Sequence, residues 1–149
     1  MMKNKMQLLL VACLALIAVP AFAQTPVASP ATSAASPAKK LADDDVVVKP
    51  KHAQFYTLTG PGTLHIAIYG RKHADKGFWV LAKSGQKEAV ELQVTTNIKG
   101  RGMVEGEKAR SFTRDITVPV GPYVVAIVNS ENLVEAITVH VRLVMDPAT

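Results

Sequence analysis

The chain has 149 residues and lacks most of the features that identify small catalytic or disulfide-bonded proteins. It holds a single cysteine, so a disulfide scaffold and a metal site with several thiolate ligands are excluded. Only one segment is continuously apolar, which excludes a membrane protein with several spanning helices. Hydrophobic residues make up 48% of the sequence, a composition that excludes a wholly disordered chain. What remains has the length of one ordinary domain.

The sequence also lacks the motifs of the common catalytic and metal-binding sites. It contains no G-x-S-x-G or S-x-x-K nucleophile motif and no H-E-x-x-H or H-x-H spacing. The acidic run Asp43-Asp44-Asp45 lacks the spacing of a calcium-binding loop. We therefore expect no catalytic residue, no metal and no cofactor, and we expect that the protein is not an enzyme. An unrecognised hydrolase, with paired acids outside any known motif, stays open as an alternative.

The apolar N-terminal segment has the pattern of a secretory signal peptide. Lys3 and Lys5 form a short basic region, an apolar run follows over residues 8–19, and small residues precede a cleavage position after Ala23. The run is shorter than the roughly 20 residues of a spanning helix. We predict that residues 1–23 are a cleaved signal peptide. The mature chain is then periplasmic or secreted and has no transmembrane segment.

A lipoprotein signal is the alternative, because the residues that end at Cys13 resemble a lipobox. We favour simple cleavage, since the apolar run continues beyond Cys13. Residues 24–45 are rich in Ala, Ser and Pro and contain no aromatic side chain, so we predict a disordered linker there. Cleavage lowers the net charge from +5 to +3, because Lys3 and Lys5 leave with the signal.

Residues 46–149 alternate between apolar and polar side chains with the two-residue period of β-strands. Gly60-Pro61-Gly62 and the residues from Pro119 to Pro122 are predicted turns. The strand candidates between such turns span residues 53–59, 63–69, 78–82, 90–94, 112–118, 123–128 and 137–144. This spacing predicts an all-β fold, a single antiparallel β-sandwich of about seven strands that is jelly-roll-like.

One part of this pattern is similar to a known family. The segment from Thr117 to Val125 resembles the strand entry of bacterial pre-peptidase C-terminal (PPC-like) domains, and Phe55–Leu58 with Gly62–Ile66 is similar to their opening hairpin. The resemblance covers about residues 52–145 and implies an exported jelly-roll accessory module, often attached to enzymes and not itself catalytic. The strand Gly77–Leu81 lacks the aspartates of the family, so no calcium site is carried over.

Basic residues gather in two predicted loops. The segment 97–110, NIKGRGMVEGEKAR, is long for a connection within a sandwich, and long loops often bind partners. Together the two loops supply the candidate contact residues Lys99, Arg101, Met103, Lys108, Arg110, Arg71 and Lys72. Such loops favour an anionic lipid, a polysaccharide or a protein. The small charge excess and the core-facing aromatic residues argue against nucleic acid.

These observations favour a non-catalytic binding or accessory module of the bacterial cell envelope, which contacts an envelope protein or an anionic surface component through the basic loops. The alternative is a sandwich that binds a small ligand or a carbohydrate on the face that carries Tyr69, His65 and His140. Both histidines occupy outward positions, so they approach each other if their strands are neighbours. A stable metal site would need further ligands, and we expect solvent-facing histidines instead.

Overall fold

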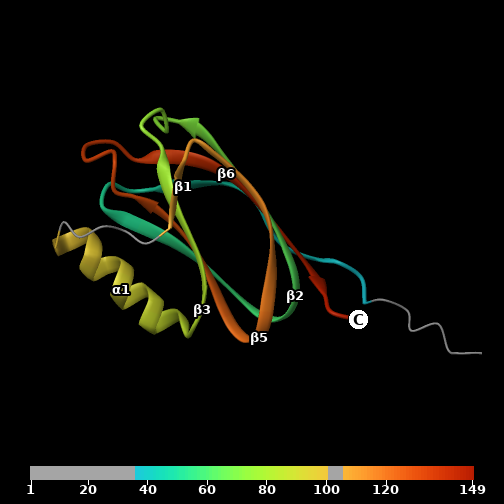
Figure 1. Cartoon of the computed structure of the whole chain (residues 1–149). Helices are drawn as coiled ribbons and strands as arrows, with labels where there is room; N and C mark the ends of the chain where they lie inside the picture. Colours follow the sequence, from blue (N-terminus) through green and yellow to red (C-terminus); the bar gives the residue numbers. More distant parts are fainter. Residues whose placement is uncertain (1–35, 101–105) are drawn as a thin grey trace, which may run out of the picture. The chain divides into compact units, whose positions relative to one another are not determined.

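The computed structural model describes residues 36–100 and 106–149, which form six β-strands and one helix (Figure 1). The elements are β1 (Lys39–Val48), β2 (His52–Lys72), β3 (Phe78–Ser84), α1 (Lys87–Gly100), β4 (Glu107–Ala109), β5 (Ser111–Asn129) and β6 (Ile137–Pro147). All of the strand pairs are antiparallel. The predicted all-β, sandwich-like fold is therefore confirmed. The predicted signal peptide, residues 1–23, lies outside the described residues.

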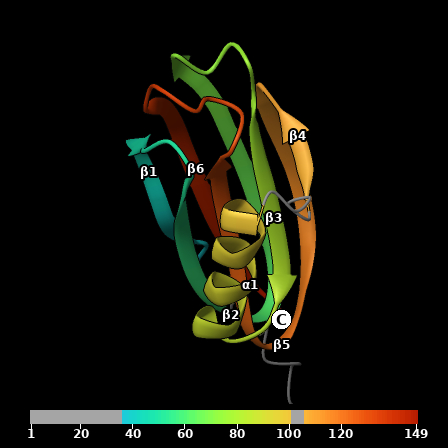
Figure 2. The ribbon, with the colours of Figure 1, turned by 90° about the vertical axis from the view of Figure 1, so that its left-hand side faces the viewer.

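Two long strands, β2 and β5, connect the whole sheet, whose order is β1-β6-β2-β5-β3-β4. From Gly62 onward β2 pairs with β6 and with the first half of β5, and these strands together with β1 are called layer A. Up to Gly60, β2 pairs with the second half of β5, and this part together with β3 and β4 is called layer B. The sheet curves strongly as it passes from one layer to the other (Figure 2).

The change of layer takes place at the two segments that were predicted as turns. The register of β2 against β5 shifts between Gly60 and Gly62, and Gly121 in β5 has a φ of 110°. Both segments stay inside their strands, so the prediction of turns at 60–62 and 119–122 is wrong. Glycine and proline bend a continuous strand here, as they do at bulges and sheet corners. Four of the predicted strands thereby become two long ones.

The apolar side chains of both layers form one core, and this sets which side chains face outward. Leu64 and Val141 of layer A are fully buried, and they belong to the same cluster as Val125 and Ile127 of layer B. Burying this aliphatic surface is the main driving force for folding. Because side chains alternate along a strand, the positions between the buried ones point away from the core. These positions make up the outer face of layer A, which is a polar surface.

The segment predicted as the fourth strand is helix α1, so that prediction is wrong. Val90 and Val94 alternate with polar residues, but they also have the four-residue spacing of one helix face. Both are buried against the outer face of layer B, where Val124 and Val128 lie, whereas Leu92 between them is 70% exposed. Among the described residues, none of the helices combines the length and the apolar character needed to span a membrane.

Strand β1 begins at Lys39, inside the segment 24–45 that was predicted as a disordered linker, so that boundary is wrong. The strand pairs with β6, from Lys39 opposite Met145 to Val48 opposite Ile137. The three aspartates of β1 interrupt the apolar alternation that identifies a strand, so the pattern did not predict β1. Charged side chains are nevertheless common on edge strands, where they limit pairing with other chains. The sheet of the described residues thus has six strands where seven were predicted.

A substitution at Gly62 tests whether β2 and β6 approach each other closely at the bend. A Cβ atom at Gly62 would collide with the carbonyl oxygen of Asp146 and with the side chain of Met145. We expect Gly62→Ala to lower the free energy of unfolding by about 1–3 kcal/mol, measured by urea denaturation followed by circular dichroism. Gly100→Ala is the control, because a Cβ there meets no atom within 4 Å. Equal unfolding midpoints for the two variants would contradict the packing described at the bend.

Candidate functional site

Basic residues from two distant parts of the sequence meet at one end of the domain. Arg71 and Lys72 end β2, and Arg110 lies between β4 and β5. The backbone N–H of Gly70 donates to the carbonyl oxygen of Arg110 at 2.9 Å, which holds the two segments side by side. A pocket of about 290 Å³ at this point is lined by Gly70, Arg71, His73, Ala74, Asp75 and Arg110. The structure therefore brings together three of the predicted contact residues.

Lys108, a fourth predicted contact residue, is engaged within the domain. Its Nζ donates to Oε2 of Glu131 at 2.8 Å, and Nε1 of Trp79 donates to the other oxygen of the same carboxylate, also at 2.8 Å. The hydrogen bond from Lys108, with a smaller effect of Trp79, lowers the pKa of the Glu131 carboxyl below its ordinary value. Lys108 thus fastens β4 to the loop after β5, and it contributes less free charge than the sequence suggests.

The predicted loop 97–110 is much shorter in the structure than in the sequence prediction. Helix α1 continues to Gly100 and β4 begins at Glu107, so both ends of the segment belong to regular elements. Lys99 lies in the last turn of α1, where its positive charge interacts favourably with the helix dipole. Arg101 and Met103 lie outside the described residues.

Three loops, 49–51, 73–77 and 130–136, lie together at this end of the domain, which we call the loop pole (Figure 2). The N–H of Lys51 donates to the carbonyl oxygen of Asn129 at 2.8 Å, and the amide of Asn132 donates to the carbonyl oxygen of His73 at 3.5 Å. Asn129 and Asn132 are buried. In the sequence, Asn129 and Asn132 are the signal of an ordered loop here, because asparagine side chains commonly bond to loop backbone.

The outer face of layer A carries a histidine that is held between two carboxylates. His65 of β2 donates from Nδ1 to Asp115 at 2.7 Å and from Nε2 to Asp146 at 2.9 Å. Asp115 lies directly opposite His65 on β5, and Asp146 lies diagonally across on β6. The hydrogen bond to Asp115, followed by that to Asp146, raises the pKa of His65 above 6.5. The two acids therefore favour the imidazolium form.

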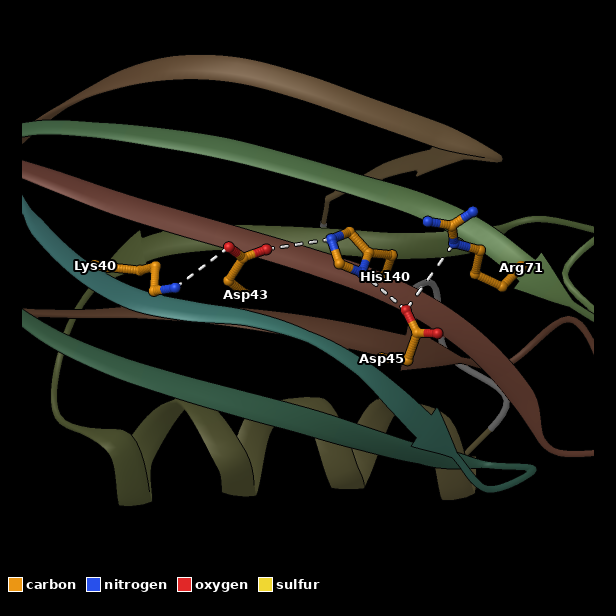
Figure 3. Close-up of polar contacts among 5 residues, drawn as sticks. All are labelled: Lys40, Asp43, Asp45, Arg71 and His140. Atoms are coloured by element: carbon orange, nitrogen blue, oxygen red, sulfur yellow. Dashed lines mark hydrogen bonds and ion pairs between the residues drawn. The ribbon is translucent and has the colours of Figure 1, made fainter.

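A second histidine of this face has a similar arrangement (Figure 3). In His140 of β6, Nδ1 lies 2.8 Å from Oδ1 of Asp45 and Nε2 lies 3.4 Å from Oδ1 of Asp43. Nζ of Lys40 lies 3.4 Å from Oδ2 of Asp43, and Nε of Arg71 lies 4.0 Å from Oδ1 of Asp45. The acidic residues of β1 thus connect this edge strand to β6 and to the end of β2.

The geometry of the two histidines does not favour metal binding or proton transfer. Both nitrogens of each ring face carboxylates, so neither nitrogen is open to a further ligand. His65 lies opposite Val144 and His140 lies opposite Tyr69 in the pairing of β2 with β6. The histidines share one face of neighbouring strands, as predicted, but roughly 13 Å separates them at the usual rise per residue. Within residues 36–100 and 106–149, no cluster of three or more His, Cys, Asp or Glu side chains suits a metal ion.

The pKa of His65 can be measured directly by NMR titration of its ring protons. We expect a value above 6.5 in the protein, lowered more by Asp115→Asn than by Asp146→Asn. Because folding raises this pKa, the associated stabilisation is complete below pH 6.5 and is lost as the pH rises through the folded-state value. The side chain is 41% exposed, so the effect on stability is small and the titration is the decisive measurement. A pKa that neither substitution changes would contradict the described hydrogen bonds.

Comparison with known proteins leaves the site to be interpreted from its own geometry. No protein-family model matches the chain, and no curated protein matches it. The resemblance of residues 52–145 to PPC-like domains therefore stays a prediction.

Proposed function

We propose that the chain is an exported, non-catalytic binding module of the bacterial cell envelope, and that it contacts an anionic envelope component through the basic residues of the loop pole. The sequence pattern of residues 1–23 supports export. The histidines of layer A support a role other than catalysis, since both nitrogens of each ring are already engaged with carboxylates. The loop pole then offers the free positive charge that binding requires.

The observation that carries this proposal is the meeting of Arg71, Lys72 and Arg110. The two segments that hold them are far apart in the sequence and are joined by the hydrogen bond between Gly70 and Arg110. All three side chains are exposed. Within the described residues, the side chains of Lys72 and Arg110 have no hydrogen bond or ion pair, and that of Arg71 has only the 4.0 Å approach to Asp45. Clustered free cations attract an anionic surface, and salt weakens this attraction.

Charge reversal at the loop pole tests the proposal. The purified full chain is sedimented with a washed bacterial envelope fraction at low salt, and the bound fraction is measured over a range of envelope concentrations. We expect the double variant Arg71→Glu, Arg110→Glu to bind about tenfold more weakly or worse, since each basic residue near an anionic surface contributes on the order of 1 kcal/mol. Added salt should weaken the binding of the unaltered chain in the same direction.

The double variant Lys39→Glu, Lys87→Glu is the matched control. It changes the net charge by the same amount, but Lys39 begins β1 and Lys87 begins α1, away from the loop pole. It should bind the envelope fraction with nearly the affinity of the unaltered chain. If both double variants lose affinity equally, the attraction comes from net charge, and the loop pole is not the binding surface.

A pocket on the outer face of layer A favours a small ligand as a second candidate function. It has a volume of about 310 Å³ and is lined by His65, Ile66, Ala67, Thr113, Arg142, Val144 and Asp146. Ala67 and Val144 form an apolar floor, and Arg142 offers a positive charge to a ligand with a negative group, whereas His65 is already paired with Asp146. Benzoate is a suitable probe. We expect it to shift the NMR signals of Ala67 and Val144, and Arg142→Glu to abolish the shifts; unchanged spectra would exclude this candidate.

A further inference from the structure

The loop 130–136 exposes two large aliphatic side chains side by side. Leu133 is 61% exposed and Val134 is 86% exposed. Single exposed apolar residues are ordinary on protein surfaces, but an adjacent pair at the tip of a loop is a candidate contact. We call this pair the aliphatic tip. It lies at the loop pole, on the same end of the domain as the basic residues described above (Figure 2).

Buried asparagine side chains hold the aliphatic tip in its exposed position. Oδ1 of Asn132 accepts from the N–H groups of Val134 at 3.3 Å and Glu135 at 3.1 Å. The N–H of Asn132 in turn donates to Oδ1 of Asn129 at 3.2 Å, and the amide of Asn129 donates to the carbonyl oxygen of Glu135 at 3.2 Å. These bonds fix the backbone on both sides of the tip, so the exposure of Leu133 and Val134 is a property of the folded loop.

Free positive charge lies at the same end of the domain as the aliphatic tip. Glu131 of loop 130–136 is paired with Lys108 at 2.8 Å, and Oε2 of Glu135 lies 3.3 Å from Nδ1 of His73. Asp75 is the remaining acid of the three loops. In contrast, five basic side chains at this end are exposed and have no ion pair within the described part of the chain, namely Lys49, Lys51, Lys72, Lys76 and Arg110.

We infer that the loop pole binds the surface of an anionic phospholipid bilayer, with Leu133 and Val134 inserted among the acyl chains. The inference rests on the proposed function and names its anionic component. A bilayer presents negative phosphates above an apolar interior, and the loop pole presents cations around an apolar tip, so the two surfaces match in charge and in polarity. The lysines bind phosphate as point charges, which tolerates the lateral freedom of lipids.

Vesicle binding by the full chain tests the inference. Vesicles of phosphatidylglycerol mixed with phosphatidylcholine are compared with vesicles of phosphatidylcholine alone, by sedimentation. We expect binding to the mixed vesicles only, and we expect Leu133→Ser, Val134→Ser to weaken it about tenfold or more, since burial of each aliphatic side chain contributes to insertion. Every variant carries the same residues 1–35, so the contribution of that segment cancels in the comparison.

The double variant Leu92→Ser, Val120→Ser is the matched control, because it removes the same pair of residue types at positions that are 70% and 82% exposed but lie outside the loop pole. It should bind the mixed vesicles like the unaltered chain. Insertion is also read directly from a tryptophan at the tip. The fluorescence of Leu133→Trp should shift to the blue when mixed vesicles are added, whereas that of Leu92→Trp should not.

The outcomes separate this inference from the proposed function. Equal vesicle binding by the tip variant and the unaltered chain would overturn the inference, and so would equal binding to both kinds of vesicle. A further outcome is that the chain binds neither kind of vesicle and still binds the envelope fraction through Arg71 and Arg110. In that case the anionic partner is a protein or a polysaccharide, and only the lipid inference is wrong. Loss of both kinds of binding would overturn the inference and the proposed function together.

Discussion

The domain depends on the close backbone approach of β2 and β5 where both strands bend. At Gly60 a side chain would collide with the carbonyl oxygen of Pro119, and at Gly62 one would collide with that of Asp146. Because the strands stay paired through the bend, one sheet supplies both layers and a single core lies between them. Because of the same bend, the two ends of β2, His52 and Lys72, lie at the same end of the domain. The three loops of the loop pole are therefore close together.

Charged residues divide into two groups that the structure separates clearly. On the outer face of layer A, acids and histidines satisfy one another across neighbouring strands, as His65 does with Asp115 and His140 with Asp45. These pairs help to fix strand register and leave little charge to offer a partner. At the loop pole, Glu131 and Glu135 have partners, and the exposed basic side chains outnumber the one remaining acid, Asp75. We therefore expect the loop pole, where positive charge is in excess, to bind a partner. We expect the paired charges on the outer face of layer A to stabilise the fold.

The sequence was informative where local pattern decides the structure and failed where distant contacts decide it. The alternation over residues 63–69 and 137–144 identified real strands, because one buried face imposes a period of two. A five-residue window that begins and ends with Val90 and Val94 fits both a strand and a helix face, and only the apolar outer face of layer B decides between them. Likewise, Arg71 and Arg110 were recognisable as basic loop residues, but their meeting depends on strand pairing.

The position of β1 has a consequence for how the domain is displayed. Lys39, where the described strand begins, is paired with Met145 near the C-terminal end of β6, whereas Val48 at the other end of β1 adjoins the loop pole. The polypeptide therefore enters and leaves the domain on the side away from the lysines and the aliphatic tip (Figure 1). Both ends of the described domain therefore lie opposite the loop pole, and neither end covers the loops.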